Sequence, residues 1–273
     1  MPRRPPLVLL PPSEGKATGG TGPPWTPGSA FAPELDERRQ RVMAALARAM
    51  AGSEKRRAAL LGVKGEALAS ATAADRDVGI APTLAAIERY TGVLYGALDV
   101  GALPATQRRR VDRQVRIFSG LWGVVAPADP IPDYKLKMSA TLPRLGRLAT
   151  WWRPAVTAAL APEVADATVW DLLPNEHRAA WAPDLDGASA PRTIVAVRFL
   201  DEVERNGTRQ LVTVSHWNKL LKGALVRHVI ATQLDDVDGL AGFDHPLGYR
   251  YDPALTERDP DGVRLRVSFV KRA

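Results

Sequence analysis

The sequence predicts an α+β fold in a single compact domain, with a mixed β-sheet flanked by helices. The chain has 273 residues, 45% of them hydrophobic, which is enough to bury a sizeable core. Segments with helical periodicity dominate the first part of the chain, and strand-like segments gather in the last third. There is no internal repeat and no linker rich enough to divide the chain, so we expect one domain over residues 1–273.

The first part of the chain begins with one short strand. Residues 7–10 are a short apolar run closed by Pro11 and Pro12, which predicts a buried strand. Residues 13–33 are rich in Gly, Pro, Ser and Thr and should form a loop. Helices are then expected over residues 34–50, 53–60, 66–72, 83–91 and 106–118, with an irregular segment over 120–132.

The later part of the chain contains the remaining strands. A helix is expected over 147–160, which Pro154 should kink or restart. We expect strands over 168–173 and 193–200, the second of them central in the sheet, and a half-exposed strand over 263–269. Asn206-Gly207 predicts a hairpin with its return strand over 210–214, and a helix is expected over 216–232.

The composition limits the function classes. A net charge of +7 and a pI of about 9.9 favour a polyanionic partner, although abundant arginine and alanine are also what a GC-rich genome encodes. The absence of cysteine excludes disulfides, thiolate catalysis and iron–sulfur clusters. The chain has no apolar run of membrane-spanning length and no segment typical of a signal peptide. We therefore expect a cytoplasmic protein that does not enter the membrane.

A possible helix-hairpin-helix covers residues 53–72. Two short helices are joined through Gly62, Lys64 and Gly65. Glycines allow the backbone to approach a phosphate closely, and amides at the start of the next helix favour an anion. Contacts of this kind position a protein on DNA without reading its sequence. The alternative is an ordinary helical hairpin with a glycine cap.

A second basic element is the predicted helix over 106–118. Helical spacing places Arg109, Arg113 and Arg116 on one face, where each could neutralise a phosphate. A solvated basic face with no partner explains the same pattern.

Two loops that follow predicted strands carry polar side chains. Ser13, Glu14 and Lys16 follow the first strand, in a sequence that lacks the spacing of a Walker phosphate loop. Glu176 and His177 follow the strand over 168–173 and could act as a general base and its partner. No histidine spacing supports a metal site, so we expect neither a metal nor a cofactor.

The helix over 216–232 presents cations near its start. Ser215 can cap it, and Lys219 and Lys222 lie on neighbouring turns, with Arg227 further along. Together these residues predict an anion-attracting helix face.

Together these segments resemble the YaaA family of peroxide stress response proteins, over nearly the whole chain. The most specific block is Ser119-Gly120-Leu121-Trp122-Gly123. The other matching segments are residues 9–16, 90–92, 116–118, 134–138, 172–176, 215–227, 242–243, 248–249 and 269–272, with Pro127, Asp129 and Trp152.

The resemblance implies a compact α/β fold with a positively charged cleft, a helix-hairpin-helix, DNA binding and protection against hydrogen peroxide. Carried over by position, the cleft residues are Lys16, Tyr134, Lys135, Glu176, Ser215, Lys219, Lys222 and Arg227. The chain departs from the family pattern in the loop before Lys16, at Ala126 and His177 in place of an arginine and an aromatic residue, and at Lys135 in place of an arginine. These departures fall in the expected cleft and leave room for a different substrate.

Two functions follow. The first is a DNA-binding, monomeric protein of the oxidative stress response, whose phosphate contacts would come from Gly62, Lys64, Gly65, Arg116, Lys135, Ser215, Lys222 and Arg227. The second is an enzyme acting on a nucleotide, a nucleobase or a damaged base. Lys16, Glu176 and Lys219 would then supply amine and carboxylate chemistry and Tyr134 a phenol, with glycosidic-bond or lyase chemistry in the cleft.

Overall fold

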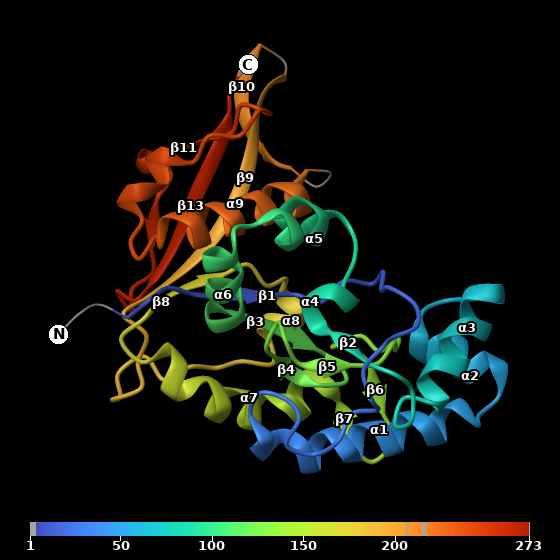
Figure 1. The fold of residues 1–273 in the computed structure, drawn as a ribbon. Helices are drawn as coiled ribbons and strands as arrows, with labels where there is room; N and C mark the ends of the chain where they lie inside the picture. The colour runs from blue at the N-terminus through green and yellow to red at the C-terminus, as the bar shows by residue number, and fades with distance from the viewer. Residues whose placement is uncertain (1–3, 206, 215–216, 273) are drawn as a thin grey trace.

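The computed structural model describes residues 4–205, 207–214 and 217–272. Over these residues, nine strands form one mixed sheet, and seven of them follow the order β11-β13-β9-β8-β1-β3-β4 (Figure 1). The predicted mixed sheet with flanking helices is confirmed, as a mixed α/β domain.

The middle of the sheet is parallel. β1 (Leu7–Leu10) pairs in parallel with β3 (Val115–Ser119) on one side and with β8 (Thr168–Asp171) on the other. β9 (Thr193–Arg205) runs parallel to β8, and β13 (Arg264–Lys271) runs parallel to β9. The sheet thus interleaves early and late strands, instead of separating helices from strands along the chain as the sequence suggested.

Antiparallel strands complete the edges of the sheet. These are β4 (Gly123–Val125), β10 (Thr208–Thr213), β11 (Arg250–Tyr251) and β12 (Glu257–Arg258). Arg205 of β9 lies opposite Thr208 of β10, which confirms the hairpin at this point, while Asn206 itself lies outside the described residues. Two small pairs stand apart, formed by β2 (Leu84–Ala85) with β5 (Pro130–Ile131) and by β6 (Thr141–Leu142) with β7 (Gly146–Arg147).

The helices form three groups. α1 (Asp36–Met50), α2 (Glu54–Leu61) and α3 (Gly65–Arg76) gather at one end of the molecule (Figure 1). The long α7 (Leu148–Val164) lies on the side of the sheet where α1 begins. The remaining helices are α4 (Ala86–Arg89), α5 (Val93–Leu98), α6 (Ala105–Gln114), α8 (Asn175–Arg178) and α9 (Asn218–Thr232), with 3-10 turns at Pro33–Leu35, Val100–Ala102, Asp238–Gly242 and Pro253–Leu255.

α5 and α9 pack closely because Gly223 has no side chain. A Cβ at this position would lie 2.2 Å from the carbonyl oxygen of Leu94 and 2.8 Å from the Cβ of Ala97, both in α5. This close packing brings the first turns of α9, which carry Lys219 and Lys222, next to the loop that precedes α5.

The predicted helix over 106–118 is wrong in its last part. α6 ends at Gln114, and the chain continues directly as β3. Val115, Ile117 and Phe118 are fully buried in that strand. Burial of this apolar run in the sheet therefore determined the local structure, and the helical spacing of the arginines did not. Arg116 is therefore on a strand and does not share a helix face with Arg109 and Arg113.

Three other local predictions need correction. Helix α7 runs through Pro154 and Pro162 without being divided. The predicted helix over 83–91 is the short strand β2 followed by the single turn α4, and the irregular segment over 120–132 contains β4 and β5. The short elements β2, α4, β4 and β5 are two to four residues long. Their formation depends on contacts distant in sequence that no local pattern records.

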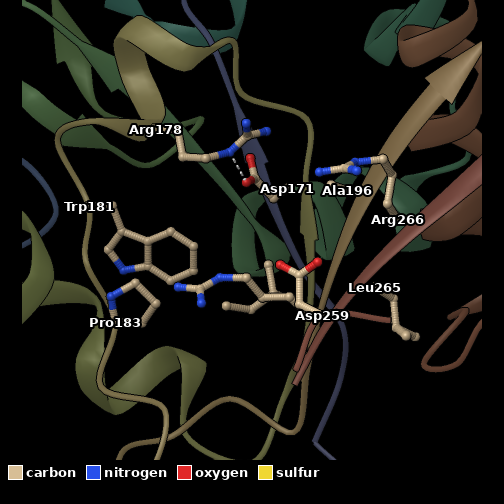
Figure 2. Close-up of a pocket in the computed structure, with 10 residues that line it drawn as sticks. Asp171, Arg178, Trp181, Pro183, Ala196, Asp259, Leu265 and Arg266 are labelled. Atoms are coloured by element: carbon tan, nitrogen blue, oxygen red, sulfur yellow. Dashed lines mark hydrogen bonds and ion pairs between the residues drawn. The ribbon is translucent and has the colours of Figure 1, made fainter. Parts of the chain in front are cut away.

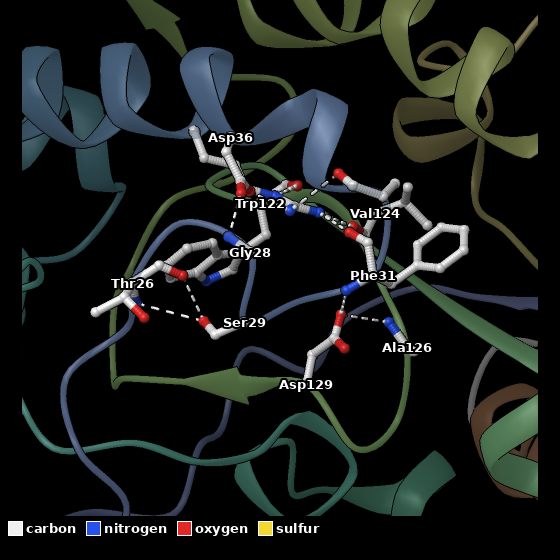
Figure 3. A network of polar contacts seen from close by, with 11 residues as sticks. Thr26, Gly28, Ser29, Phe31, Asp36, Trp122, Val124, Ala126 and Asp129 are labelled. Carbon is white, nitrogen blue, oxygen red and sulfur yellow. Dashed lines mark hydrogen bonds and ion pairs between the residues drawn. The ribbon is translucent and has the colours of Figure 1, made fainter.

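A buried arginine holds the loop before α1 in place. Arg39 is fully buried and donates to the carbonyl oxygens of Phe31 at 2.7 Å and Val124 at 2.9 Å, and to Asp36 at 2.7 Å. Asp129 in turn accepts from the backbone N–H of Phe31 at 2.9 Å (Figure 3). Buried charges are stable only when they are paired and hydrogen-bonded in this way.

None of the helices in the described residues is both long and apolar enough to span a membrane.

Candidate functional site

The sheet changes its winding direction between β1 and β8. After β1 the next strand of the sheet is β3, on one side, and after β8 it is β9, on the other. Loops that leave neighbouring parallel strands in opposite directions open a crevice at the carboxyl ends of those strands, where α/β proteins commonly bind ligands. The two polar loops predicted from the sequence leave these two strands.

A cavity of about 530 Å³ lies at this position. It contains three of the segments expected to form the cleft, namely the loop after β1, the loop after β8 and residues 134–137. Its charged lining consists of Glu14, Lys16, Lys135, Lys137, Glu176 and Lys219, together with His177. Four lysines against two glutamates favour an anionic ligand, and the volume is that of a small-molecule site.

The loop that carries Lys16 is held against the segment before α5. Ala17 N donates to the carbonyl oxygen of Arg89 at 2.9 Å, and Thr91 N donates to that of Gly15 at 3.1 Å. Gly92 has a φ of 105°, and a Cβ there would lie 2.8 Å from the hydroxyl oxygen of Ser13. Backbone hydrogen bonds and the close approach at Gly92 thus hold this loop against the segment before α5.

Lys16 is partly buried, and its amine faces aromatic rings. Nζ lies 4.4 Å from the ring centre of Tyr134 and 5.7 Å from that of Tyr90, and it donates to the carbonyl oxygen of Ser13 at 3.2 Å. Burial lowers the pKa of Lys16 to about 8. The negative charges of Asp133 and Asp75 oppose this lowering only in part. About a tenth of this amine is thus uncharged at pH 7, far more than for a lysine of ordinary pKa.

A chain of hydroxyls lies beneath that amine. The Tyr134 hydroxyl is 2.7 Å from the Tyr90 hydroxyl and 2.7 Å from Ser119 Oγ. Ser119 Oγ also accepts from the backbone N–H groups of Leu121 and Trp122. Burial raises the pKa of Tyr90 to about 12 and that of Tyr134 well above its usual value. The phenol of Tyr134 is therefore protonated, and its hydroxyl is hydrogen-bonded to Tyr90 and Ser119 in the interior. The residue lines the cavity with its ring.

The loop after β8 is braced by an ion pair. Arg178 donates to Asp171 at 2.5 Å and to the carbonyl oxygen of Leu173 at 2.9 Å, and Asp171 accepts from Leu173 N at 2.9 Å. Lys222 donates to the carbonyl oxygen of Leu172 at 3.0 Å, and burial lowers its pKa. Lys222 thus holds this loop, whereas Lys219, one turn earlier on α9, is exposed and lines the cavity.

Glu176 and His177 line the cavity from α8. His177 is buried, with 5% of its surface exposed, and burial lowers its pKa to about 4. Its Nδ1 lies 3.6 Å from Glu176 Oε1, but the imidazole is neutral at pH 7, so the two do not form an ion pair. Among the described residues neither ring nitrogen has a hydrogen-bond partner. Both nitrogens are themselves buried, so a ligand in the cavity reaches them only if this side chain or its neighbours move.

A buried carboxyl group reaches the site from α3. Asp75 is fully buried, and its Oδ1 accepts from the backbone N–H of Lys135 at 2.7 Å. Oδ2 makes no hydrogen bond within the described part of the chain. Burial raises the pKa of Asp75 to about 7, against the nearby charge of Lys16.

The turn between α2 and α3 lies beside this cavity. Gly62 and Gly65 have φ values of 68° and 57°, and Lys64 between them is exposed. A Cβ on Gly62 would lie 3.6 Å from the amine of Lys137, a residue that also lines the cavity. A hollow of about 590 Å³ borders the turn, lined by Arg56, Gly62 and Lys137 among others. Lys137 therefore joins the turn to the cavity.

The remaining predicted residues lie elsewhere. Arg116 is buried on β3, where it pairs with Glu163 at 2.6 Å and covers the ring of Phe31. Arg227 lies on α9 near the end of α5 and donates to the carbonyl oxygen of Leu98 at 3.4 Å. Ser215 lies outside the described residues.

A second cavity, of about 220 Å³, opens on the other side of the Asp171–Arg178 pair. It is lined by Trp181 and three arginines, Arg178, Arg264 and Arg266 (Figure 2). Each arginine already has a carboxylate partner, with Asp171 for Arg178, Asp261 for Arg264 and Glu257 for Arg266. These cations are neutralised by the protein itself, so the cavity with the lysines is the stronger candidate.

Comparison with known proteins agrees with the resemblance in the sequence. Residues 7–255 match the family model described as "Peroxide stress protein YaaA". The chain belongs to the YaaA family. Among its relatives is UPF0246 protein SCO2297 of Streptomyces coelicolor, which is 41% identical over 226 residues, 83% of each chain. A Corynebacterium efficiens protein, CE1889, is 37% identical over 83% of this chain and 85% of its own.

Sequence reasoning about this YaaA family member missed part of the cavity. Glu14 and Lys137 were noticed only as parts of motifs, whereas His177 was expected to be the partner of Glu176. Glu14 pairs with Lys135 at 3.2 Å and with Lys137 at 3.5 Å, a grouping that the alternation of the two lysines on an extended segment could have indicated. Asp75 had no sequence signal, because an acidic residue near a helix end is usually solvated.

Proposed function

We propose that the protein binds DNA in the response to hydrogen peroxide and admits one unpaired nucleotide into the lysine-lined cavity. The observation that carries this proposal is the position of Lys137, which borders both the Gly62 turn and the cavity. A backbone held at the turn can then continue into the site. The cavity volume of about 530 Å³ suits one nucleotide and is far too small for a duplex.

The α2–α3 turn has the features that a helix-hairpin-helix needs. Two left-handed glycines keep the backbone open, the exposed Lys64 adds a charge, and the first amides of α3 face an approaching phosphate. The basic pI and the net charge of +7 support this interpretation. We infer that the protein acts as a monomer in the cytoplasm.

Salt-dependent binding tests the proposal. A gel-shift series with a random-sequence duplex should show retardation that weakens steeply as salt rises. Lys64→Ala should lower the affinity uniformly across sequences and reduce the slope of log K against log salt by about 1. Lys271→Ala, on the exposed end of β13, serves as the charge-matched control. Absence of retardation at low salt would end the proposal.

A second function, an enzyme acting on a nucleotide, a nucleobase or a damaged base, is favoured by Glu176 and His177. Their side chains lie 3.6 Å apart at the cavity, and the neutral imidazole has both nitrogens free among the described residues. A carboxylate at the cavity can act as a general base, with the neighbouring imidazole as its positioning partner. Turnover by the wild type and its loss in Glu176→Gln would support this function, and equal turnover in both would remove Glu176 from it.

A further inference from the structure

The lysines of the cavity differ in their surroundings. Lys135 and Lys137 share the carboxylate of Glu14, and Lys222, behind the cavity, donates to the carbonyl oxygen of Leu172. Lys219 is exposed to solvent. Lys16 is partly buried, and the carboxylates that influence it, those of Asp133, Asp75 and Glu14, act through space and not through a hydrogen bond.

The contacts of Lys16 leave its nitrogen lone pair available. Nζ stands over the face of Tyr134 at 4.4 Å and donates one hydrogen bond to the carbonyl oxygen of Ser13. A ring face and a single acceptor stabilise an ammonium less well than water does, so the charged form is destabilised, in agreement with its pKa of about 8. Desolvated lysines of this kind are the ones that attack carbonyl carbons.

We propose that Lys16 forms an imine with a sugar aldehyde bound in the cavity, the aldehyde that a DNA strand exposes where a base has been lost. The inference rests on the proposed DNA binding and adds the substrate class and the reacting atom. The ring-opened sugar at such a position carries a phosphate on either side and an aldehyde carbon. The lysines of the cavity attract the phosphates, and no base has to be accommodated.

The chemistry needs only the amine, the aldehyde and proton transfers. The lone pair of Nζ attacks the aldehyde carbon and forms a C–N bond, while the carbonyl oxygen takes a proton and becomes a hydroxyl. The nitrogen gives up one proton, the hydroxyl takes a second proton and leaves as water, and the nitrogen forms a double bond to the carbon. Loss of the remaining N–H proton converts this iminium into the imine. Glu176 lines the same cavity and can carry these protons. No oxidant or reductant is required.

Reductive trapping tests the inference in the full-length protein. Sodium cyanoborohydride converts an imine into a stable secondary amine, which peptide mass spectrometry locates. With 2-deoxyribose 5-phosphate as the probe, the adduct should map to Lys16. Lys16→Ala and the charge-preserving Lys16→Arg should each lower the adduct yield at least about tenfold, whereas Lys271→Ala should leave it unchanged.

A second probe separates this inference from the proposed function. A duplex with one base-less position should form a covalent complex through Lys16, and an intact duplex should bind without forming one. If intact DNA binds but neither probe adds to Lys16, or the adduct maps to another lysine such as Lys219, the imine assignment is wrong and DNA binding stands. If the sugar phosphate adds to Lys16 but DNA does not bind, the amine chemistry stands and the proposed function is wrong.

Discussion

At the scale of single residues, the site is defined by groups whose burial opposes their usual charge. Asp75 and Lys16 are both desolvated, so the pKa of the carboxyl rises to about 7 while that of the amine falls to about 8. His177 is buried as well and stays neutral at pH 7. Perturbations of this kind reduce stability and are concentrated at functional sites. They imply measurable pH dependence at two residues.

Asp75→Asn should stabilise the protein more at pH 8 than at pH 5. The folded protein holds the Asp75 proton up to a pKa of about 7, whereas the ordinary pKa of an aspartate exposed to water, as in the unfolded chain, is 3.8. The contribution of the protonated carboxyl is therefore complete below pH 3.8 and is lost as pH rises through 7. Asn does not titrate, so its advantage over Asp should grow by about 2 kcal/mol between pH 5 and pH 8.

Urea unfolding at the two pH values measures this difference. Asn retains an oxygen that can accept from the backbone N–H of Lys135, so the existing hydrogen bond is preserved. The control is Asp77→Asn, two residues away, because the Asp77 side chain is exposed. It gives the effect of the same substitution at the surface of this segment. Equal effects at both pH values would mean that Asp75 is ionised throughout.

The nucleophilicity of Lys16 should titrate near pH 8. Burial lowers its pKa, Asp133, Asp75 and Glu14 oppose that shift, and Lys135 reinforces it. The rate of acetylation by a trace of labelled acetic anhydride should rise up to about pH 8 and then level off, because the amine is then uncharged. Peptide mass spectrometry measures the rate at Lys16 and, in the same samples, at the exposed Lys271 as the reference. Parallel curves for the two lysines would contradict the desolvated state of Lys16.

At the scale of elements, close helix packing is what brings the cations of α9 to the cavity. Gly223→Val should destabilise the protein by about 1–3 kcal/mol, because the new side chain would meet Leu94 O and Ala97 in α5. Thermal unfolding followed by circular dichroism measures the change. Gly96→Ala is the matched control in α5, since a Cβ there has no atom within 4 Å, and it should be neutral or slightly stabilising. A Gly223→Val melting curve like that of the wild type would show that the two helices can separate without cost.

The sequence predicted elements well where the local pattern was strong. The strand at Leu7–Leu10, the helix α1 and the β9–β10 hairpin all have a clear periodicity or turn signal and are confirmed. The arginine-rich segment was misjudged because helical spacing of Arg109, Arg113 and Arg116 ignores the buried apolar residues around the last of them. The sequence predicted only in part that Lys16, Glu176 and Tyr134 gather at one cavity. Their gathering depends on strand order, which is set by contacts between residues distant in the chain.

At the scale of the whole molecule, the proposed DNA binding and the position of the cavity beside the α2–α3 turn together imply a preference among DNA structures. A duplex held at the turn, as proposed, cannot enter a space of about 530 Å³. An unpaired nucleotide can enter, and Lys135 and Lys219 would then lie near its phosphates. We therefore expect tighter binding to a duplex with one bulged nucleotide than to the fully paired duplex of the same length.

Fluorescence anisotropy with the two duplexes at equal salt measures this preference. Substitution of the exposed Lys219 by Ala should reduce the advantage of the bulged duplex while leaving the affinity for the paired duplex nearly unchanged, because Lys219 lines the cavity and not the hollow at the turn. Lys64→Ala should weaken both duplexes by a similar factor, because the turn holds the backbone in either case. If Lys219→Ala weakened both equally, the cavity and the turn would belong to one undivided surface, and entry of a nucleotide would lose its support.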